Sequence, residues 1–277
     1  MHRKKMSCVR CGRTAVALVL LHSFLAVGNG LAVLRFRGGG GLAFDAALFD
    51  FDGTLAESES LHRLAFSKVL GKEISVEEWE TKCVGTPPPK LMVDLLPESR
   101  KGENVDELLA QRSAIFEKWV DEGKLVGTPG AEDLLDYLRE QGIRCAVVSS
   151  GSRSYIVKAL QRLGLLDFFE IIVAGDDDVM REGCSVHGAP HHKPHPFPYL
   201  HAATRLGLRP ERCIAFEDSI PGIRSAQAAG MLVIGVRNSA NAALPVVPDE
   251  EPCPRTGIQP LMDLVDDFEA LDRRFLF

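Results

Sequence analysis

The sequence predicts an α/β protein, a Rossmann-like parallel sheet core with an inserted all-helical cap domain. From residue 46 onward, short apolar runs of strand length alternate with segments whose apolar residues have helical spacing. This alternation is typical of a parallel sheet with helices on both faces. Between residue 57 and about residue 127 it stops, because that stretch contains only helical patterns. These two observations decide the fold class.

The expected strands and helices of the core follow one another in chain order. Apolar runs that we expect to be strands lie at residues 46–51, 143–150, 169–175, 212–218 and 231–236. Helices are expected at residues 127–142, 152–164, 199–207, 220–230 and 261–275. Gly142 and Gly164 close two of these helices, since glycine readily adopts the left-handed conformation that ends a helix.

The interrupting stretch has helical spacing in three segments, at residues 61–70, 87–98 and 104–123. Prolines favour the start of the second segment, and a further proline ends it. A group of helices this long needs a small hydrophobic core of its own. We therefore expect a helical cap at residues 57–127 and an α/β core formed by residues 45–56 and 128–277.

The charge of the chain is unevenly distributed. The 277 residues carry a net charge of −6, with 45% apolar and 25% charged residues, which is ordinary for a globular protein. Residues 1–44 contain seven basic and no acidic side chains, whereas the rest holds 25 basic and 38 acidic ones. An acidic body argues against nucleic acid as a partner.

The basic residues 1–44 have the pattern of a presequence. A charged start precedes the apolar run TAVALVLLHSFLAV at residues 14–27, and small residues follow it, as in a secretory signal. The run would span only about 21 Å as a helix, less than the ~30 Å of a bilayer core, so no stable membrane anchor is expected after processing. The Gly-rich, acid-free stretch behind it resembles the two-part presequences of algae with secondary plastids. A plain secretory signal or a misassigned start codon remain as alternatives.

The seven cysteines do not form a recognisable disulfide framework, which is typical of a reducing compartment. Cys145 and Cys213 lie within apolar runs and are expected in the core. Cys8 and Cys11 have the spacing of a metal-binding pair, but without a second pair a zinc site is the weaker interpretation.

Polar side chains follow the expected strands. Asp50 and Asp52 end the first strand, Ser149 and Ser150 end the second, and a Glu-Asp pair at residues 217–218 ends the fourth. In an open α/β sheet the carboxyl ends of the strands meet at one crevice, where ligands bind. Helix capping would explain any one of these polar ends, but it explains the set poorly.

These strand ends together predict a phosphate site with a metal ion. Asp50, Glu217 and Asp218 would bring three carboxylates to one place, which requires a cation, and oxygen ligands suit Mg²⁺. Ser149 offers a hydroxyl and nearby free amides at the start of a helix, and Lys193 offers a fixed positive charge.

These residues carry a resemblance to a known family. Asp50-Phe51-Asp52-Gly53-Thr54 resembles the first signature of the haloacid dehalogenase superfamily of phosphotransferases. Ser149 resembles the second signature, Lys193 the third, and Phe216-Glu217-Asp218-Ser219 the fourth. The resemblance covers residues 46 to about 236.

The resemblance implies a role for each signature residue. Asp50 would attack phosphorus, and Asp52 would protonate the leaving oxygen and later deprotonate water. Mg²⁺ would be held by Asp50, the backbone carbonyl of Asp52 and Asp218, with Glu217 as a ligand or an outer-shell partner. Phosphoryl oxygens would be bound by the side chains and strand-end groups of Ser149, Ser150 and Lys193.

The segment after the first signature resembles the β-phosphoglucomutase-like branch, which carries a helical cap. His62 falls where that branch places a histidine near the closing cap, and a plain helix-face histidine is the alternative. Gly85 lies where the specificity loop of the cap would enter the site. Lys90 would reach a second anionic group or, as the alternative, remain solvated at the surface.

Two departures from the family pattern stand out near the third signature. Phe197 replaces the acidic residue that usually follows it. An unusually long connection also carries histidines and a cysteine, for which we expect a solvated loop rather than a zinc site; they are Cys184, His187, His191, His192 and His195.

The expected function is that of a Mg²⁺-dependent phosphatase that hydrolyses a small sugar or polyol phosphate monoester through an aspartyl-phosphate. A β-phosphoglucomutase-type isomerase would use the same aspartates and pass the phosphoryl group to a sugar. A catalytically silent binding protein on the same fold is the third possibility. The expected partner is a small phosphorylated metabolite, and the sequence gives no indication of oligomeric state.

Overall fold

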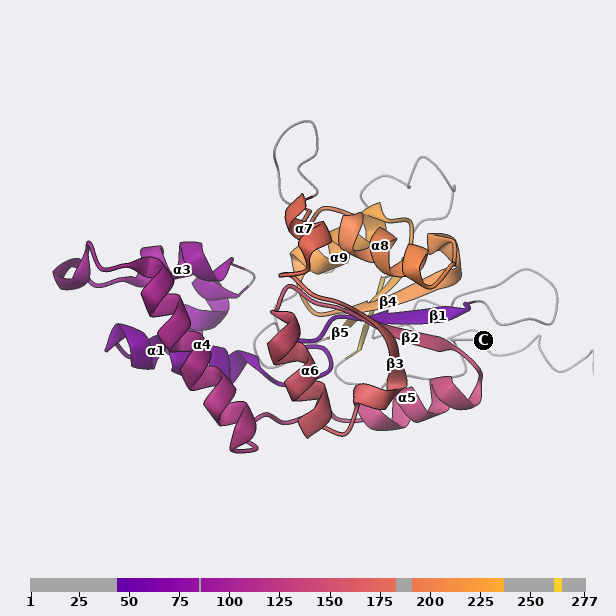
Figure 1. Cartoon of the computed structure of the whole chain (residues 1–277), viewed down its shortest axis with the longest axis horizontal. Coiled ribbons are helices and arrows are strands. Elements are labelled where there is room, and N and C mark those ends of the chain that lie inside the picture. Colours follow the sequence, from indigo (N-terminus) through magenta and orange to yellow (C-terminus); the bar gives the residue numbers. More distant parts are fainter. Residues whose placement is uncertain (1–43, 85, 183–190, 237–261, 266–277) are drawn as a thin grey trace, which may run out of the picture. The chain divides into compact units, whose positions relative to one another are not determined.

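The structure is a computed structural model that describes residues 44–84, 86–182, 191–236 and 262–265. A parallel sheet of six strands in the order β3-β2-β1-β4-β5-β6 forms its centre (Figure 1). The strands are β1 (Ala46–Phe49), β2 (Arg144–Val148), β3 (Phe169–Val173), β4 (Cys213–Glu217), β5 (Leu232–Val236) and β6 (Met262–Val265). This confirms the predicted α/β class with a parallel sheet.

The register of β1 brings the ends of three strands together. Phe49 at the end of β1 pairs with Val147 on β2 and with Phe216 on β4. The residues that follow these pairs therefore leave the sheet at the same edge. Because β1 lies between β2 and β4, the first aspartate after β1 lies at the middle of that edge.

Helices cover both faces of the sheet, as Figure 1 shows. Alternate residues of β1 face opposite sides, since Ala47 and Phe49 belong to one hydrophobic cluster and Ala46 and Leu48 to another. The first cluster includes residues of α5 (Ala131–Glu140) and α6 (Arg153–Arg162), and the second includes residues of α7 (Asp178–Glu182), α8 (Phe197–Arg205) and α9 (Ile220–Ala228).

The described residues between β1 and β2 form helices as their only secondary-structure elements of more than a single bridge. We call residues 59–121 the insertion. Its α-helices are α1 (Glu59–Leu70), α2 (Val76–Glu78), α3 (Pro88–Leu95) and α4 (Val105–Asp121). A π-helical segment, Trp79–Cys83, continues directly from α2. A third hydrophobic cluster lies within the insertion and includes Phe66, Trp79 and Met92. The insertion is thus helical and contains a hydrophobic cluster of its own.

The C-terminal segment differs from the prediction. A helix was expected over residues 261–275, but Met262–Val265 forms β6, which pairs in parallel with β5 from Val233 to Val236. The helical spacing of the apolar residues is a local signal, whereas β5 offers an edge of free backbone hydrogen-bonding groups. Pairing with that edge overrides the local pattern.

Several expectations fall outside the described residues. The predicted presequence, its cysteine pair, Gly85, Cys184 and His187 are among them, and they stay predictions. Within the described part of the chain, no helix has both the length and the apolar character needed to cross a membrane. Cys145 and Cys213 are buried, as expected, and both are free thiols.

Candidate active site

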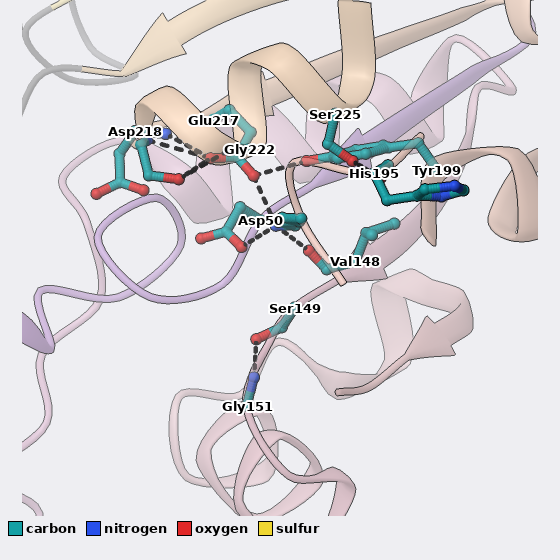
Figure 2. A network of polar contacts seen from close by, with 12 residues as sticks. Asp50, Val148, Ser149, Gly151, His195, Tyr199, Glu217, Asp218, Gly222 and Ser225 are labelled. Carbon is teal, nitrogen blue, oxygen red and sulfur yellow. Dashed lines mark hydrogen bonds and ion pairs between the residues drawn. The ribbon is translucent and has the colours of Figure 1, made fainter. Parts of the chain in front are cut away.

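Asp50 lies directly after β1, at the edge where the strand ends meet. Its backbone nitrogen donates a hydrogen bond to the carbonyl oxygen of Phe216 on β4 at 2.9 Å. The residue is only 7% exposed. Figure 2 shows its carboxylate beside Glu217 and Asp218 at the end of β4. The neighbouring strands thus fix the position of this carboxylate.

Lys193 joins two of these carboxylates. Its Nζ donates to Asp50 Oδ1 at 2.5 Å, to Glu217 Oε1 at 2.6 Å and to the Val148 carbonyl oxygen at 2.8 Å. The three protons of the ammonium group therefore all have acceptors. Burial alone would lower the pKa of Lys193, but the attraction of the two carboxylates raises it. The lysine is a fixed positive charge at the end of β2.

Glu217 is fully buried, and both of its oxygens are hydrogen-bonded. Oε1 accepts from Lys193 and from the Tyr199 hydroxyl at 2.9 Å. Oε2 accepts from the backbone nitrogens of Asp218 and Ser219 and from the Ser219 hydroxyl. These five bonds hold the turn from β4 into α9, so that Glu217 positions Lys193 and Asp218.

Gly222 makes room for the Glu217 side chain. A Cβ atom at this position would lie 1.8 Å from Glu217 Oε1, far closer than any real contact. Glycine in the first turn of α9 therefore lets the helix approach the buried carboxylate. Ser219 caps the same helix, since its side chain accepts from the Gly222 nitrogen.

Asp50, Glu217 and Asp218 form a group whose carboxylate oxygens lie within 4.8 Å of one another. Burial raises the pKa of Asp50 to about 8, with Lys193 acting in the opposite direction. Three buried carboxylates with a single lysine among them leave negative charge uncompensated, and a hard divalent cation with oxygen ligands fits this donor set. Since Glu217 is fully engaged in hydrogen bonds, Asp50 and Asp218 are the side chains that suit Mg²⁺ best.

Ser149 and Ser150 end β2 on the other side of Asp50. Ser149 is 5% exposed, and its Oγ accepts a hydrogen bond from the Gly151 nitrogen at 3.0 Å (Figure 2). Ser150 is exposed and lines the neighbouring cavity. A Cβ on Gly175 would lie 2.2 Å from the Ser150 carbonyl oxygen, so the glycine after β3 lets this turn pack closely.

The Asp52 side chain points toward the insertion. Its Oδ1 accepts from the Tyr155 hydroxyl at 2.6 Å and lies 3.1 Å from His62 Nε2. Burial favours the neutral acid, but the hydrogen bonds from His62 and Tyr155 outweigh it and lower the pKa of Asp52 to about 2. The carboxylate group at the ends of β1 and β4 does not include this side chain, so only its backbone carbonyl suits the metal role that the resemblance implies.

His62 and Arg112 continue this chain of contacts into the insertion. Arg112 Nη2 donates to His62 Nδ1, and a guanidinium group can only donate. Nδ1 is therefore an acceptor, and Nε2 carries the proton that faces Asp52. The His62 ring also stacks on Phe116, with ring centroids 4.2 Å apart.

A cavity of about 660 Å³ lies between the strand ends and the insertion, a size that suits a small metabolite. Asp52, Ser150 and Gly151 line it from the core. The insertion contributes apolar and aromatic residues, among them Phe66, Trp79, Leu109 and Phe116, together with His62 and Arg112.

The structure brings most of the predicted site residues together, with one clear exception. Lys193 contacts Asp50, the carboxylate oxygens of Asp50 and Asp218 lie within 4.8 Å of each other, and His62 lines the cavity. Lys90, by contrast, lies at the surface with a 66% exposed side chain and pairs with Asp94 one turn later. It is not among the cavity residues, so the solvated alternative describes it better.

Three contacting residues were not found from the sequence: Tyr155, Tyr199 and Arg112. Tyr155 on α6 contacts Asp52. The sequence offered one signal for it, because Tyr155 lies in the first turn of a helix that follows a serine-rich strand end. Tyr199 and Arg112 lie on helices whose patterns indicate only packing and solvation. No local signal distinguishes them.

A parallel α/β sheet with paired carboxylates, a buried lysine and a serine at adjacent strand ends is typical of an enzyme class that acts on small anionic substrates. Comparison with known families makes this specific. The model of the family described as "Haloacid dehalogenase-like hydrolase" matches residues 47–236. The chain belongs to this family, as the four signatures indicated.

Individual relatives agree with the family assignment. The chain is 31% identical over 201 residues to validoxylamine A 7'-phosphate phosphatase of Streptomyces hygroscopicus, which covers 72% of this chain and 88% of the relative. It is 29% identical over 194 residues to the fructose-1-phosphate phosphatase YqaB of Escherichia coli, covering 69% and 95%. A crystal structure of CbbY from Rhodobacter sphaeroides in complex with phosphate has a TM-score of 0.66 at 26% identity and covers 84% of this chain and 99% of CbbY.

Proposed function

We propose that the protein is a Mg²⁺-dependent phosphatase that hydrolyses a small sugar or polyol phosphate monoester through an aspartyl-phosphate on Asp50. The observation that carries the proposal is the buried group of Asp50, Glu217 and Asp218, within 4.8 Å of one another, with Lys193 Nζ 2.5 Å from Asp50 Oδ1. Positive charge fixed beside the attacking carboxylate, from Lys193 and from a cation that the acidic group would hold, is what the attack of an anion on an anionic phosphoryl group requires.

In the first half of the reaction, Asp50 attacks phosphorus and the bond to the leaving oxygen breaks. Lys193 and the Ser149 hydroxyl stabilise the negative charge on the phosphoryl oxygens. Bound Mg²⁺, held by Asp50 and Asp218, supplies further positive charge that favours the ionised form of Asp50.

Asp52 transfers a proton in each half of the proposed reaction. A protonated Asp52 gives its proton to the leaving oxygen, and the resulting carboxylate then takes a proton from the water that hydrolyses the aspartyl-phosphate. The low pKa of about 2 belongs to Asp52 held by His62 and Tyr155, the carboxylate form that the second half uses. The approach of a negatively charged phosphate raises this pKa and favours the acid form for the first half.

We propose that the insertion acts as a cap, which encloses the leaving group of the substrate. Support comes from the cavity, whose walls combine the catalytic Asp52 with side chains of α1 and α4. Its apolar walls exclude water from the ester and favour the carbon skeleton of a small metabolite. The names of two relatives, validoxylamine A 7'-phosphate phosphatase and fructose-1-phosphate phosphatase, agree with this substrate class.

Phosphate release by the purified full chain tests the proposal. A panel of roughly a hundred metabolite monoesters is to be incubated with and without Mg²⁺, and release is expected only with the metal. Asp50→Asn is expected to lower kcat by about 10⁴-fold or more, because the nucleophile is lost. Asp136→Asn, on the exposed side of α5, is the matched control and should keep full activity.

Two results would contradict the proposal. Phosphate release that persists in Asp50→Asn would exclude the aspartyl-phosphate. Conversion of β-glucose 1-phosphate into glucose 6-phosphate without an equal amount of free phosphate would instead show the isomerase, in which the phosphoryl group passes to a sugar.

A further inference from the structure

Arg112 on α4 is a cation in the cavity wall that has no anionic partner among the described residues. Its Nη2 donates to His62 Nδ1, and its Cζ lies over the Phe66 and Phe116 rings at 5.2 and 5.0 Å from their centroids. Its Nε is buried without a hydrogen-bond partner. A guanidinium group has five N–H donors. The hydrogen bond to His62 and the packing on the two rings use only part of them.

An unpaired guanidinium in such a place is costly. Aromatic rings and one neutral imidazole offset the loss of hydration far less than a carboxylate does. The pKa of Arg112 is accordingly lowered by burial, with Asp52, Tyr155 and Glu59 acting in the opposite direction at longer range. An anion bound at this side chain would therefore offset the cost of burying its charge.

The acidic side chains of the same cavity already have donors, so they do not neutralise Arg112 by contact. Glu59 accepts from Trp79 Nε1 at 2.8 Å, and Asp176 accepts from the backbone nitrogen of Arg153 at 2.7 Å. Glu117 lies 3.6 Å from Lys158 Nζ. Within the described cavity wall, Arg112 therefore has hydrogen-bond donors without acceptors, whereas each of these carboxylates already contacts another donor.

The position of Arg112 fixes where that anion would lie relative to the reaction. One imidazole ring, that of His62, separates the guanidinium group from Asp52. Hydrogen-bond lengths and the width of the ring place the guanidinium within ~8 Å of the Asp52 carboxylate. A substrate whose leaving oxygen contacts Asp52 thus brings groups a few bonds away from that oxygen within reach of Arg112.

We propose that Arg112 forms a second anion subsite, so that the preferred substrate carries a carboxylate or a second phosphate a few bonds from the ester oxygen. This inference rests on the proposed phosphatase function and narrows its substrate class. Arginine binds either anion through two parallel hydrogen bonds. Arg112 would then determine specificity, while Asp50 and Lys193 provide the chemistry common to all esters.

Three probes that share a two-carbon skeleton test the subsite. They are 2-hydroxyethyl phosphate, which has no second anionic group, 2-phosphoglycolate, which adds a carboxylate, and ethylene glycol bisphosphate, which adds a phosphate. The mono- and bisphosphates of 1,4-butanediol extend the series to a longer spacing. The wild-type protein is expected to prefer at least one probe with a second anionic group over its partner without one by about tenfold or more in kcat/KM. The carboxylate and phosphate arms show which anion the subsite takes.

Arg112→Gln is expected to lower that preference by about tenfold or more, and Arg112→Lys to keep part of it, because lysine retains the charge without the bidentate geometry. Lys118→Gln is the matched control. It removes a cation from the same helix at a 73% exposed position that pairs only with Glu122 among the described carboxylates, and the preference should stay unchanged.

A wild-type protein without preference for any doubly anionic probe would overturn the inference. So would an Arg112→Gln variant that loses activity equally on the probes with and without a second anionic group, since Arg112 would then act only by positioning His62. Calorimetric binding of the probes to Asp50→Asn separates the two proposals. Preferential binding without turnover in the wild type would support the subsite and contradict the phosphatase, whereas turnover without preference would do the reverse.

Discussion

The core and the insertion build the two halves of the site in opposite ways. At the strand ends of the core, Lys193 has three acceptors and Glu217 has five hydrogen bonds, so each buried charge is tied to others. In the insertion, the cavity wall is largely apolar and aromatic, and its one arginine, Arg112, contacts no carboxylate of the described chain.

This difference indicates which half of the site tolerates the replacement of side chains. A buried network in which every charge has partners loses several contacts when any one member is replaced, so the core chemistry tolerates little variation. An apolar wall with a single unsatisfied cation can exchange side chains at a modest cost in stability. We therefore expect the core to determine the reaction type and the insertion to determine the choice of substrate.

The largest expected difference between the two halves is seen when one lysine of each is replaced. Lys193→Met would leave Asp50 and Glu217 as buried carboxylates without a counter-charge, and we expect a loss of about 3–5 kcal/mol in the free energy of unfolding together with loss of phosphate release. Lys90→Met, on the exposed face of α3, should cost less than about 0.5 kcal/mol. Urea unfolding of both variants measures this, and equal losses would break the comparison.

Glycines give the next contrast. Gly222→Ala would place a Cβ atom 1.8 Å from Glu217 Oε1, so the carboxylate or α9 must shift. We expect a loss of about 1–3 kcal/mol in unfolding free energy, as for other overpacked sites, and a clear fall in kcat. The control is Gly127→Ala, where the chain returns from the insertion to the core and the nearest atoms lie 3.9 Å away. An unchanged kcat in Gly222→Ala would show that Glu217 does not position the site.

A partly exposed ion pair of the core should have a smaller, pH-dependent effect. Asp177 accepts from Arg153 at 2.7 Å through both of its oxygens and from the Ala174 nitrogen at 3.0 Å. Burial opposes ionisation, but these bonds lower the pKa of Asp177 below its ordinary value. Asp177→Asn is expected to cost about 1–2 kcal/mol in unfolding free energy at pH 7.

The sign of the pH dependence follows from the lowered pKa. The stabilising effect of ionised Asp177 is fully present above the unfolded-state pKa of about 3.9. It is lost as the pH falls through the lower pKa of the folded state. The difference between wild type and Asp177→Asn in urea unfolding should therefore shrink below about pH 4. Asp94→Asn, at an exposed pair of the insertion, is the control and should show little difference at either pH.

The smallest effect is expected where the two halves contact each other. Lys158 on α6 lies 3.2 Å from Asp121 and 3.6 Å from Glu117 on α4. Because these side chains are partly exposed, Lys158→Gln should lower the unfolding free energy by less than about 1 kcal/mol, and 1 M NaCl should remove the difference. A large, salt-independent loss would show that these ion pairs, rather than apolar packing, hold the insertion to the core.

The sequence by itself determined the order of the core strands and helices up to β5 and the chemistry at their ends. The first is a local signal, because apolar runs of strand length that alternate with helices predict a parallel sheet. The second is a general property of such a sheet, in which the carboxyl ends of the strands lie at one edge for any loop sequence. The sequence alone therefore places Asp50, Ser149 and Asp218 near one another.

Only the tertiary structure decided which polar groups meet. Lys193 lies 143 residues from Asp50 in the chain, and the contacts of Arg112 with His62 and of Tyr155 with Asp52 also join distant segments. It likewise decided that Met262–Val265 forms a strand, because the free edge of β5 lies far away in sequence. Pattern and spacing carry information over a few turns of chain, whereas these contacts depend on the direction in which whole elements pack.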